Sequence, residues 1–347
     1  MRAFFATIVA IVIGGFAAPG AIAGDGLQEL RICLDTGPNH LRNLAVRQFA
    51  ELLEAALPDR FHIRIFDSGQ LYNDRDATKA LIWGDMELAL PTVIQLARFE
   101  PAANITSLPM FYGLSPRVLD PVLDETVGPA LAGRIEARLP VVVLSPNLDL
   151  GYVHVFSTNR SIRSVHDLAG LKVRVFGGAA NLKRLKAQGA NPVVIPWADT
   201  PLALSQGNID AIASSFETLQ SASLWDAGIE HGFEDRGMFI QYVPLVRRSF
   251  WAGLDPATQA TFARTWREAM SNARVFSASR QEEARKKALE HGVTLTTPDP
   301  QAITSERARL RELQDGMVSE LRIPPEIVRL AEEAILAALS RQGDDDE

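Results

Sequence analysis

The sequence predicts an α/β protein with two lobes and a cleft between them. Two stretches, residues 27–90 and 139–216, each alternate between strand-like and helix-like patterns. That order implies parallel strands joined by helical crossovers. Residues 256–292 keep a helical period for more than 30 residues, which corresponds to roughly 50 Å. Because one small lobe does not need so long a helix, we expect it to lie across both lobes.

The first alternating stretch predicts three strands and two helices. The strands fall at residues 27–34, 61–66 and 86–91, and the helices at 39–57 and 74–85.

The second stretch continues in the same way. Strands are predicted at residues 140–145, 152–158, 171–175, 191–196 and 209–216, helices at 179–189 and 201–207, and a final helix at 325–342.

The composition is that of an ordinary globular protein: 347 residues, of which 47% are apolar and 22% charged. A chain of this length can build two sizeable cores. The formal charge of −7 gives no general attraction to nucleic acid or to anionic membranes, and no basic stripe is interleaved with aromatic residues. No nucleic-acid partner is therefore expected.

Residues 1–23 have the pattern of a secretory signal peptide. A positively charged start is followed by an apolar run over residues 3–18 and by an A-x-A cleavage site at Ala21-Ile22-Ala23. The run is shorter than the roughly 20 residues that span a bilayer, so a retained anchor is the weaker alternative. The mature chain is expected to be exported.

No enzyme motif is present. The chain has no G-x-S-x-G, P-loop, G-x-G-x-x-G or H-E-x-x-H sequence, and its six histidines include no i,i+4 pair. Cys33 is the only cysteine, so a Cys-rich zinc site and an intramolecular disulfide are both excluded, and Cys33 is expected to be a small buried residue. The sequence predicts no catalytic residue, no cofactor and no metal ligand, and it leaves a bound cation open.

Residues 167–178 (DLAGLKVRVFGG) combine a buried strand pattern with positive charge. The apolar residues fall on one face of the strand, and Lys172 and Arg174 fall on the other. Ligands of such sheets bind beyond the carboxyl ends of strands, which makes the loops at residues 176–181 and 36–40 candidate sites. The alternation alone leaves Arg174 equally open to a surface role.

Six segments together resemble the solute-binding receptors of TRAP transporters, the DctP-like family of periplasmic proteins. They follow the family's order across nearly the whole mature chain: RQFAELLEAAL, IFDSGQLYNDRDATKAL, STNRSIRSVHDLAGLKVRV, QGANPVVIPW, LSQGNIDAIASS and SFWAGLDPATQATF.

The resemblance implies a type II-like periplasmic-binding-protein fold, in which strands cross between two α/β lobes and a long helix spans both. It also implies a periplasmic receptor, not an enzyme, that closes on a small solute, usually a carboxylate. The receptor would deliver this solute to the small and large membrane subunits of an ion-driven transporter.

The implied lobes are discontinuous in sequence. Lobe I takes residues 27–150 and about 240–279, lobe II takes residues 151–239 and about 280–341, and residues 342–347 form an acidic, disordered tail.

The resemblance assigns the carboxylate-binding role to Arg174, since a planar guanidinium offers a carboxylate two parallel N–H bonds. Many members carry a second arginine upstream, and here its position maps to Val153 or His154. That arginine is therefore absent, and His154 is a candidate to donate one hydrogen bond in its place. The polar residue that orients the main arginine maps to Ser214 or Ser215.

Six further residues are weaker candidates for solute contacts. They are the aromatic walls Phe216 and Trp197, Gln70 and Arg75 near the start of a helix, and Asn39 and His40 after the first strand. The role of Glu217 stays open between a hydrogen-bond partner and a helix-capping acid. The expected solute is a compact or partly apolar monocarboxylate or hydroxy acid, with a neutral or amine-bearing solute left open.

Two other functions remain alternatives. An ABC-type periplasmic binding protein also closes two α/β lobes, although the long helix and the GLKVRV strand argue against it. An exported hydrolase is motivated only by His154 and Glu217, which would have to share a cleft.

Overall fold

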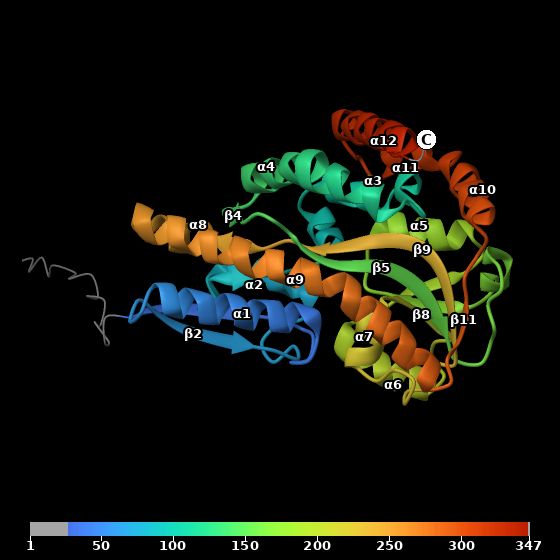
Figure 1. The fold of residues 1–347 in the computed structure, drawn as a ribbon, viewed down its shortest axis with the longest axis horizontal. Coiled ribbons are helices and arrows are strands. Elements are labelled where there is room, and N and C mark those ends of the chain that lie inside the picture. The colour runs from blue at the N-terminus through green and yellow to red at the C-terminus, as the bar shows by residue number, and fades with distance from the viewer. Residues whose placement is uncertain (1–26, 346–347) are drawn as a thin grey trace, which may run out of the picture.

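The computed structural model describes residues 27–345, which form two mixed β-sheets with helices packed around them (Figure 1). The predicted signal peptide, residues 1–23, lies outside the described residues. Within 27–345, no helix combines the length and the apolar character needed to cross a bilayer.

The first sheet has five strands. In β1, Leu30 and Ile32 are buried while the residues between them are partly exposed, as expected for a strand with one face on the core. β1 pairs parallel with β2 and β3, and β10 pairs antiparallel with β3 and β4. The order across the sheet is β2 (Phe61–Phe66), β1 (Gln28–Cys33), β3 (Leu88–Ala89), β10 (Leu245–Arg247) and β4 (Val141–Val143).

Two helices connect the parallel strands of this sheet, α1 (Leu41–Ala56) and α2 (Asp74–Trp83). Each begins at a capping side chain: His40 accepts from the backbone N–H of Arg42, and Asn73 accepts from that of Asp76. Cys33 is buried in β1, as predicted.

The second sheet has six strands. β6 pairs parallel with β7 and β8, whereas β5 pairs antiparallel with β8 and β9. The expectation of parallel pairing throughout was therefore wrong for β5, as it was for β4. The order is β11 (Thr294–Thr296), β9 (His231–Tyr242), β5 (Leu148–Ser157), β8 (Ala211–Ser214), β6 (Lys172–Val175) and β7 (Asn191–Val194).

Two strand-to-strand connections cross between the sheets. The chain leaves β4 in the first sheet and enters β5 of the second at Leu148, and it returns from β9, which ends at Tyr242, into β10 of the first. This confirms the expectation that crossing strands join the lobes. The proposed lobe boundaries at 150/151 and 239/240 fall inside β5 and β9 and stay predictions.

The long helix predicted from the sequence is α9 (Pro256–Glu290), with 35 residues. Asp255 caps its first turn by accepting from the backbone N–H of Thr258, and Pro256 opens the helix. α9 packs against α1 beside the first sheet and against α7 (Phe216–Ser221) and β5 in the second. Figure 1 shows it in orange, running from the part of the molecule that contains α1 to the part that contains α7. The prediction that it spans both lobes is confirmed.

The remaining helices surround the sheets. α12 (Pro325–Asp345) packs against α3 and η4. These two helices belong to residues 27–150, the range predicted for lobe I, whereas the residues of α12 were assigned to lobe II. That assignment stays a prediction. The tail expected to be disordered begins inside α12. The others are η1 (Val93–Arg98), η2 (Pro101–Ser107), η3 (Pro109–Phe111), α3 (Pro116–Pro121), η4 (Val122–Val127), α4 (Gly128–Arg138), η5 (Val165–Leu168), α5 (Ala179–Ala187), η6 (Trp197–Asp199), α6 (Thr200–Ser205), α8 (Arg248–Ala252), α10 (Pro300–Arg311) and α11 (Gln314–Glu320).

Trp266 anchors α9 in the core of the first lobe. Its side chain is fully buried, and its ring meets that of Phe49 edge-on with 5.2 Å between the centroids. The indole N–H donates to the backbone oxygen of Pro146 at 3.0 Å. One side chain thus holds α9 against both α1 and the segment that leads into β5.

We expect Trp266→Ala to lower the free energy of unfolding by about 3–5 kcal/mol, because it leaves a large cavity and an unpaired carbonyl. Val275→Ala, at a site on the same helix that is 75% exposed, should change it by less than about 0.5 kcal/mol. Urea denaturation of both variants and the parent chain measures the difference. Equal losses in the two variants would contradict the assigned anchor.

Candidate functional site

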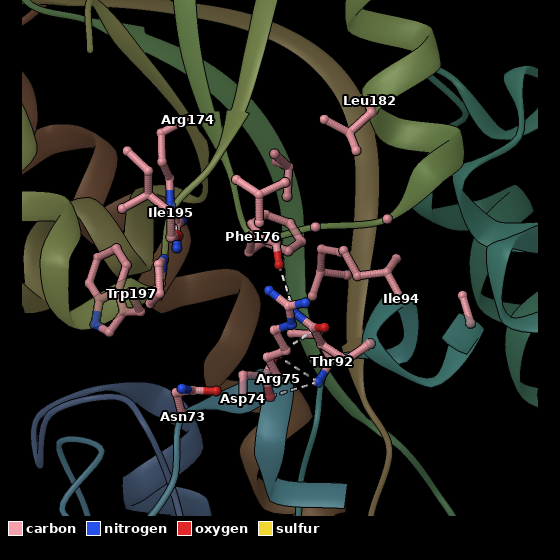
Figure 2. Close-up of a pocket in the computed structure, with 18 of the residues that line it drawn as sticks. Asn73, Asp74, Arg75, Thr92, Ile94, Arg174, Phe176, Leu182, Ile195 and Trp197 are labelled. Atoms are coloured by element: carbon pink, nitrogen blue, oxygen red, sulfur yellow. Dashed lines mark hydrogen bonds between the residues drawn. The ribbon is translucent and has the colours of Figure 1, made fainter. Parts of the chain in front are cut away.

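A cavity of about 570 Å³ is lined by residues from both lobes. The segments after β1 and β3 and the start of α2 form one wall, and the ends of β6, β7 and β8 form the opposite wall. This placement agrees with the rule that ligands of such sheets bind beyond the carboxyl ends of strands. Much of the lining is apolar, including Ile94, Phe176, Leu182, Ile195 and Trp197 (Figure 2).

Arg174 reaches into this cavity from β6 (Figure 2). The residue is only 3% exposed. Its Nε donates to the backbone oxygen of Ile195 at 2.9 Å, and within residues 27–345 its two terminal nitrogens have no hydrogen-bond or ion-pair partner. Its guanidinium carbon lies 5.5 Å from the ring centroid of Trp197. Burial lowers the pKa of Arg174 to about 10, so the group is still a cation at neutral pH.

The loop after β6 brings the two walls together. Gly177 and Gly178 both have positive φ angles, of 126° and 82°. A Cβ on Gly178 would lie 3.2 Å from Cδ1 of Ile94, so a larger residue would crowd the opposite wall. The side-chain amide of Gln95 donates to the backbone oxygen of Phe176 at 2.6 Å. These contacts make the FGG sequence a point of close approach between the lobes.

The opposite wall carries two carboxylates and a buried arginine. Asp35 follows β1, and Asp74 is the first residue of α2; the backbone N–H of Asp74 donates to Asp35 at 3.2 Å. Arg42, 2% exposed, forms an ion pair with Asp35 and lies 3.7 Å from Asp74. The hydroxyl of Thr92 donates to Asp74 at 2.6 Å. The guanidinium of Arg42 also lies over the ring of Tyr242, 4.3 Å from its centroid.

The two carboxylates share one strong counter-charge, and this affects their titration. Burial and the charge of Asp35 raise the pKa of Asp74 to about 7, against the opposing effects of Arg42 and of the hydrogen bonds from Thr92. Near neutral pH the carboxyl group of Asp74 is therefore either protonated or charged, and a neighbouring cation or anion shifts this balance.

A polar corner joins the two walls. Ser214, Ser215 and Thr218 line the cavity from β8 and α7. The hydroxyl of Thr218 lies 3.0 Å from that of Ser215 and 3.2 Å from Nε2 of His40, the cap of α1. His40 does not line the cavity but touches a residue that does.

Glu217 stabilises this polar corner from outside the cavity lining. It is fully buried, and its Oε1 accepts from the backbone N–H of Leu41 at 2.8 Å, at the start of α1. Arg280 of α9 donates to the same carboxylate at 3.0 Å and 3.2 Å. Burial raises the pKa of Glu217. Glu217 thus acts as both hydrogen-bond partner and helix cap, and it joins α1, α7 and α9.

Five of the ten predicted site residues line the cavity: Arg174, Ser214, Ser215, Trp197 and Arg75. His154 does not. Its neighbour Val153 does, whereas His154 pairs with Ser214 of β8 at the point where the register of β5 against β9 shifts, between Val153 and Val155. There its Nδ1 accepts from the backbone N–H of Arg236 at 3.3 Å, and burial lowers its pKa to about 3. His154 is thus partnered by the chain itself and lies outside the cavity lining that holds Arg174.

The other four predicted residues also lie outside the lining. Phe216 packs against His154, with 5.3 Å between the ring centroids, and Gln70 is exposed. Asn39 is exposed, and its backbone oxygen accepts from Arg280 at 3.2 Å. His40 caps α1, as described above.

Apart from Arg75, the sequence-based prediction missed the residues of the first wall. Asp35 stands directly after the predicted strand at residues 27–34, so the strand-end rule that selected residues 36–40 would have reached it one residue earlier. Asp74 opens a predicted helix and has the appearance of an ordinary N-terminal acid. Arg42 carries no signal in sequence, because nothing in the helical period marks a buried arginine.

Among residues 27–345, no group of three or more histidine, cysteine, aspartate or glutamate side chains is arranged to hold a metal ion. Asp35 and Asp74 therefore face Arg42 without a third acidic ligand.

The folded-state pKa of Asp74 exceeds its unfolded value, so unfolding releases a proton between about pH 4 and pH 7 and stability falls as the pH rises through that window. Asp74→Asn removes this titration. We expect the variant to gain stability relative to the parent chain as the pH is raised from 4 to 7. Urea denaturation at several pH values measures this, and a constant difference between the two chains would contradict it.

Comparison with known proteins identifies the family. The model of the bacterial extracellular solute-binding protein family 7, DctP, matches residues 35–321. The 2,3-diketo-L-gulonate-binding periplasmic protein YiaO of Escherichia coli is 23% identical over 292 residues, covering 83% of this chain and 86% of the relative. The C4-dicarboxylate-binding periplasmic protein DctP of Shewanella loihica is 20% identical over 265 residues, covering 74% and 75%.

Solved structures share the fold. The sugar acid binding protein DctPAm from Advenella mimigardefordensis, in complex with galactonate, has a TM-score of 0.82 at 20% identity over 91% of this chain and 100% of its own. A TRAP periplasmic solute-binding protein from Ralstonia eutropha with bound (S)-2-acetolactate has a TM-score of 0.83 at 22% identity over 89% and 99%. The chain therefore belongs to the bacterial extracellular solute-binding protein family 7.

Proposed function

We propose that this protein is the periplasmic receptor of a TRAP-type transporter and that it captures a small organic acid between its lobes. Arg174 binds the carboxylate, and the loaded receptor delivers the acid to the small and large membrane subunits. No bond of the solute is made or broken. Residues 1–23 would direct export, in keeping with relatives that are named as periplasmic.

The observation that carries this proposal is the state of the Arg174 guanidinium. It is buried at a cavity surface with two nitrogens unpartnered within the described chain. A buried cation without a partner costs free energy, and a carboxylate that accepts two parallel N–H bonds would offset that cost. The Phe176 and Trp197 rings lie 5.9 Å and 5.5 Å from the guanidinium carbon, and such apolar neighbours lower the local polarity and strengthen a charged pair.

Capture by lobe closure follows from the two-walled site. A solute that touches only one wall gains part of the available contacts, whereas a solute that touches both favours the arrangement in which the walls are close. The crossing strands allow the lobes to rotate without separating.

A single arginine anchors the solute in this proposal. Val153 stands in the cavity wall at one of the two positions where many family members have a second arginine. Solutes that need two arginine clamps are therefore unsuited to this cavity, and a monocarboxylate is favoured.

The test is a thermal-shift screen of the full mature chain against a library of organic acids. An acid present at 100 times its dissociation constant should add about 2.7 kcal/mol to the free energy of unfolding. Arg174→Met keeps the side-chain volume but removes the charge. It should abolish the shift while leaving the ligand-free melting temperature unchanged or higher, because a buried unpaired cation is lost.

Lys172→Met is the matched control, since Lys172 is an exposed residue of the same strand, and it should retain the full shift. An acid that stabilises Arg174→Met as well as the parent chain would refute the anchor role. Recovery of the acid after incubation distinguishes a receptor, which returns it unchanged, from a hydrolase.

A further inference from the structure

The cavity has opposite charges on its two walls. Arg174 stands on the wall of the second sheet and Asp74 on the wall of the first (Figure 2). Asp35 lies beside Asp74 on the first wall. The two carboxylates act on Arg174 through space and raise its pKa against the larger effect of burial. Within residues 27–345, however, no ion pair joins Arg174 to either of them. The walls are thus close enough to interact and far enough apart to admit a solute.

When Asp74 is ionised, the first wall carries two negative charges and one positive charge. Asp35 and Asp74 share Arg42, which lies 3.7 Å from Asp74, and among the described residues no other cation pairs with either carboxylate. Arg75 lines the cavity but is exposed and forms no ion pair with them. The side chains of Asp35 and Asp74 are 10% and 13% exposed. A second positive charge would therefore find acceptors there.

We propose that the solute is a zwitterion, with a carboxylate that pairs with Arg174 and an ammonium group that pairs with Asp35 and Asp74. This inference rests on the proposed function and narrows its solute class. The carbon skeleton lies between the two charges, against Phe176, Ile195 and Trp197.

The same arrangement disfavours a dicarboxylate. With one carboxylate on Arg174, the second would face Asp35 and Asp74, and like charges at a buried site repel each other. The preference expected here therefore differs from that named for the C4-dicarboxylate-binding relative.

The test uses matched acids that differ only at the far end. The ω-amino acids of four to six carbons are compared with the plain, ω-hydroxy and dicarboxylic acids of equal length, and piperidine-4-carboxylate is compared with cyclohexanecarboxylate. Affinities are measured by calorimetry at pH 8, where Asp74 is ionised. We expect at least one ammonium-bearing acid to bind about tenfold or more tightly than each of its matched partners, and the dicarboxylic acids to bind least.

Asp74→Asn keeps an acceptor oxygen for Thr92 but removes the charge, and it should reduce the preference for the ammonium group about tenfold. Asp76→Asn is the control, because Asp76 lies in the same turn of α2 and does not line the cavity. It should leave the preference unchanged. Melting temperatures of the free variants show whether each one folds.

The outcomes separate the two proposals. If plain, hydroxy or dicarboxylic acids bind as tightly as their amino counterparts and their binding is lost in Arg174→Met, the receptor function stands and the zwitterion is refuted. A preference that survives both Asp74→Asn and Asp35→Asn also refutes it. If no acid of any class binds the parent chain, both proposals fail.

Discussion

The arrangement of the site depends on one guanidinium, that of Arg174, which folding buries without giving its terminal nitrogens hydrogen-bond partners among the described residues. Arg174 is held by the strand pairing of β6 and by a single bond to Ile195, while its terminal nitrogens are left for the cavity. The opposite wall has the complementary feature, two carboxylates that share one arginine. Neither wall balances its own charges. The folded protein therefore favours a solute that supplies the missing charges in the cavity between the walls.

Most of the fold could be predicted from sequence, because its signals are local. Alternation located β1, β2, β6 and β8, and helical periodicity located α1 and α9 close to their observed bounds. The pairing direction of β4 and β5 could not be read, since it depends on β9 and β10, which are distant in sequence. β9 itself was missed. Its sequence, HGFEDRGMFIQY, mixes charges and glycines into the strand and gives no steady period.

The site was half predictable for the same reason. Arg174 could be selected because its strand pattern and the family resemblance agree, and Trp197 and Ser214 follow from neighbouring strand ends. His154 was selected as a replacement for the missing arginine, but its ring nitrogen accepts from the backbone of Arg236 and it lies outside the cavity lining. Arg42 became part of the site only through tertiary packing, where it meets Tyr242 and carboxylates from two other segments. No rule of spacing brings those segments together.

The length of α9 has a consequence for the relative motion of the two lobes. A rigid rod of about 50 Å that is fixed to α1 at one part and to α7 at another prevents the lobes from drawing apart along its axis. The relative motion that remains is a rotation of one lobe against the other. None of the residues that line the cavity belongs to α9, so the helix that couples the two lobes does so without forming a wall of the proposed binding site.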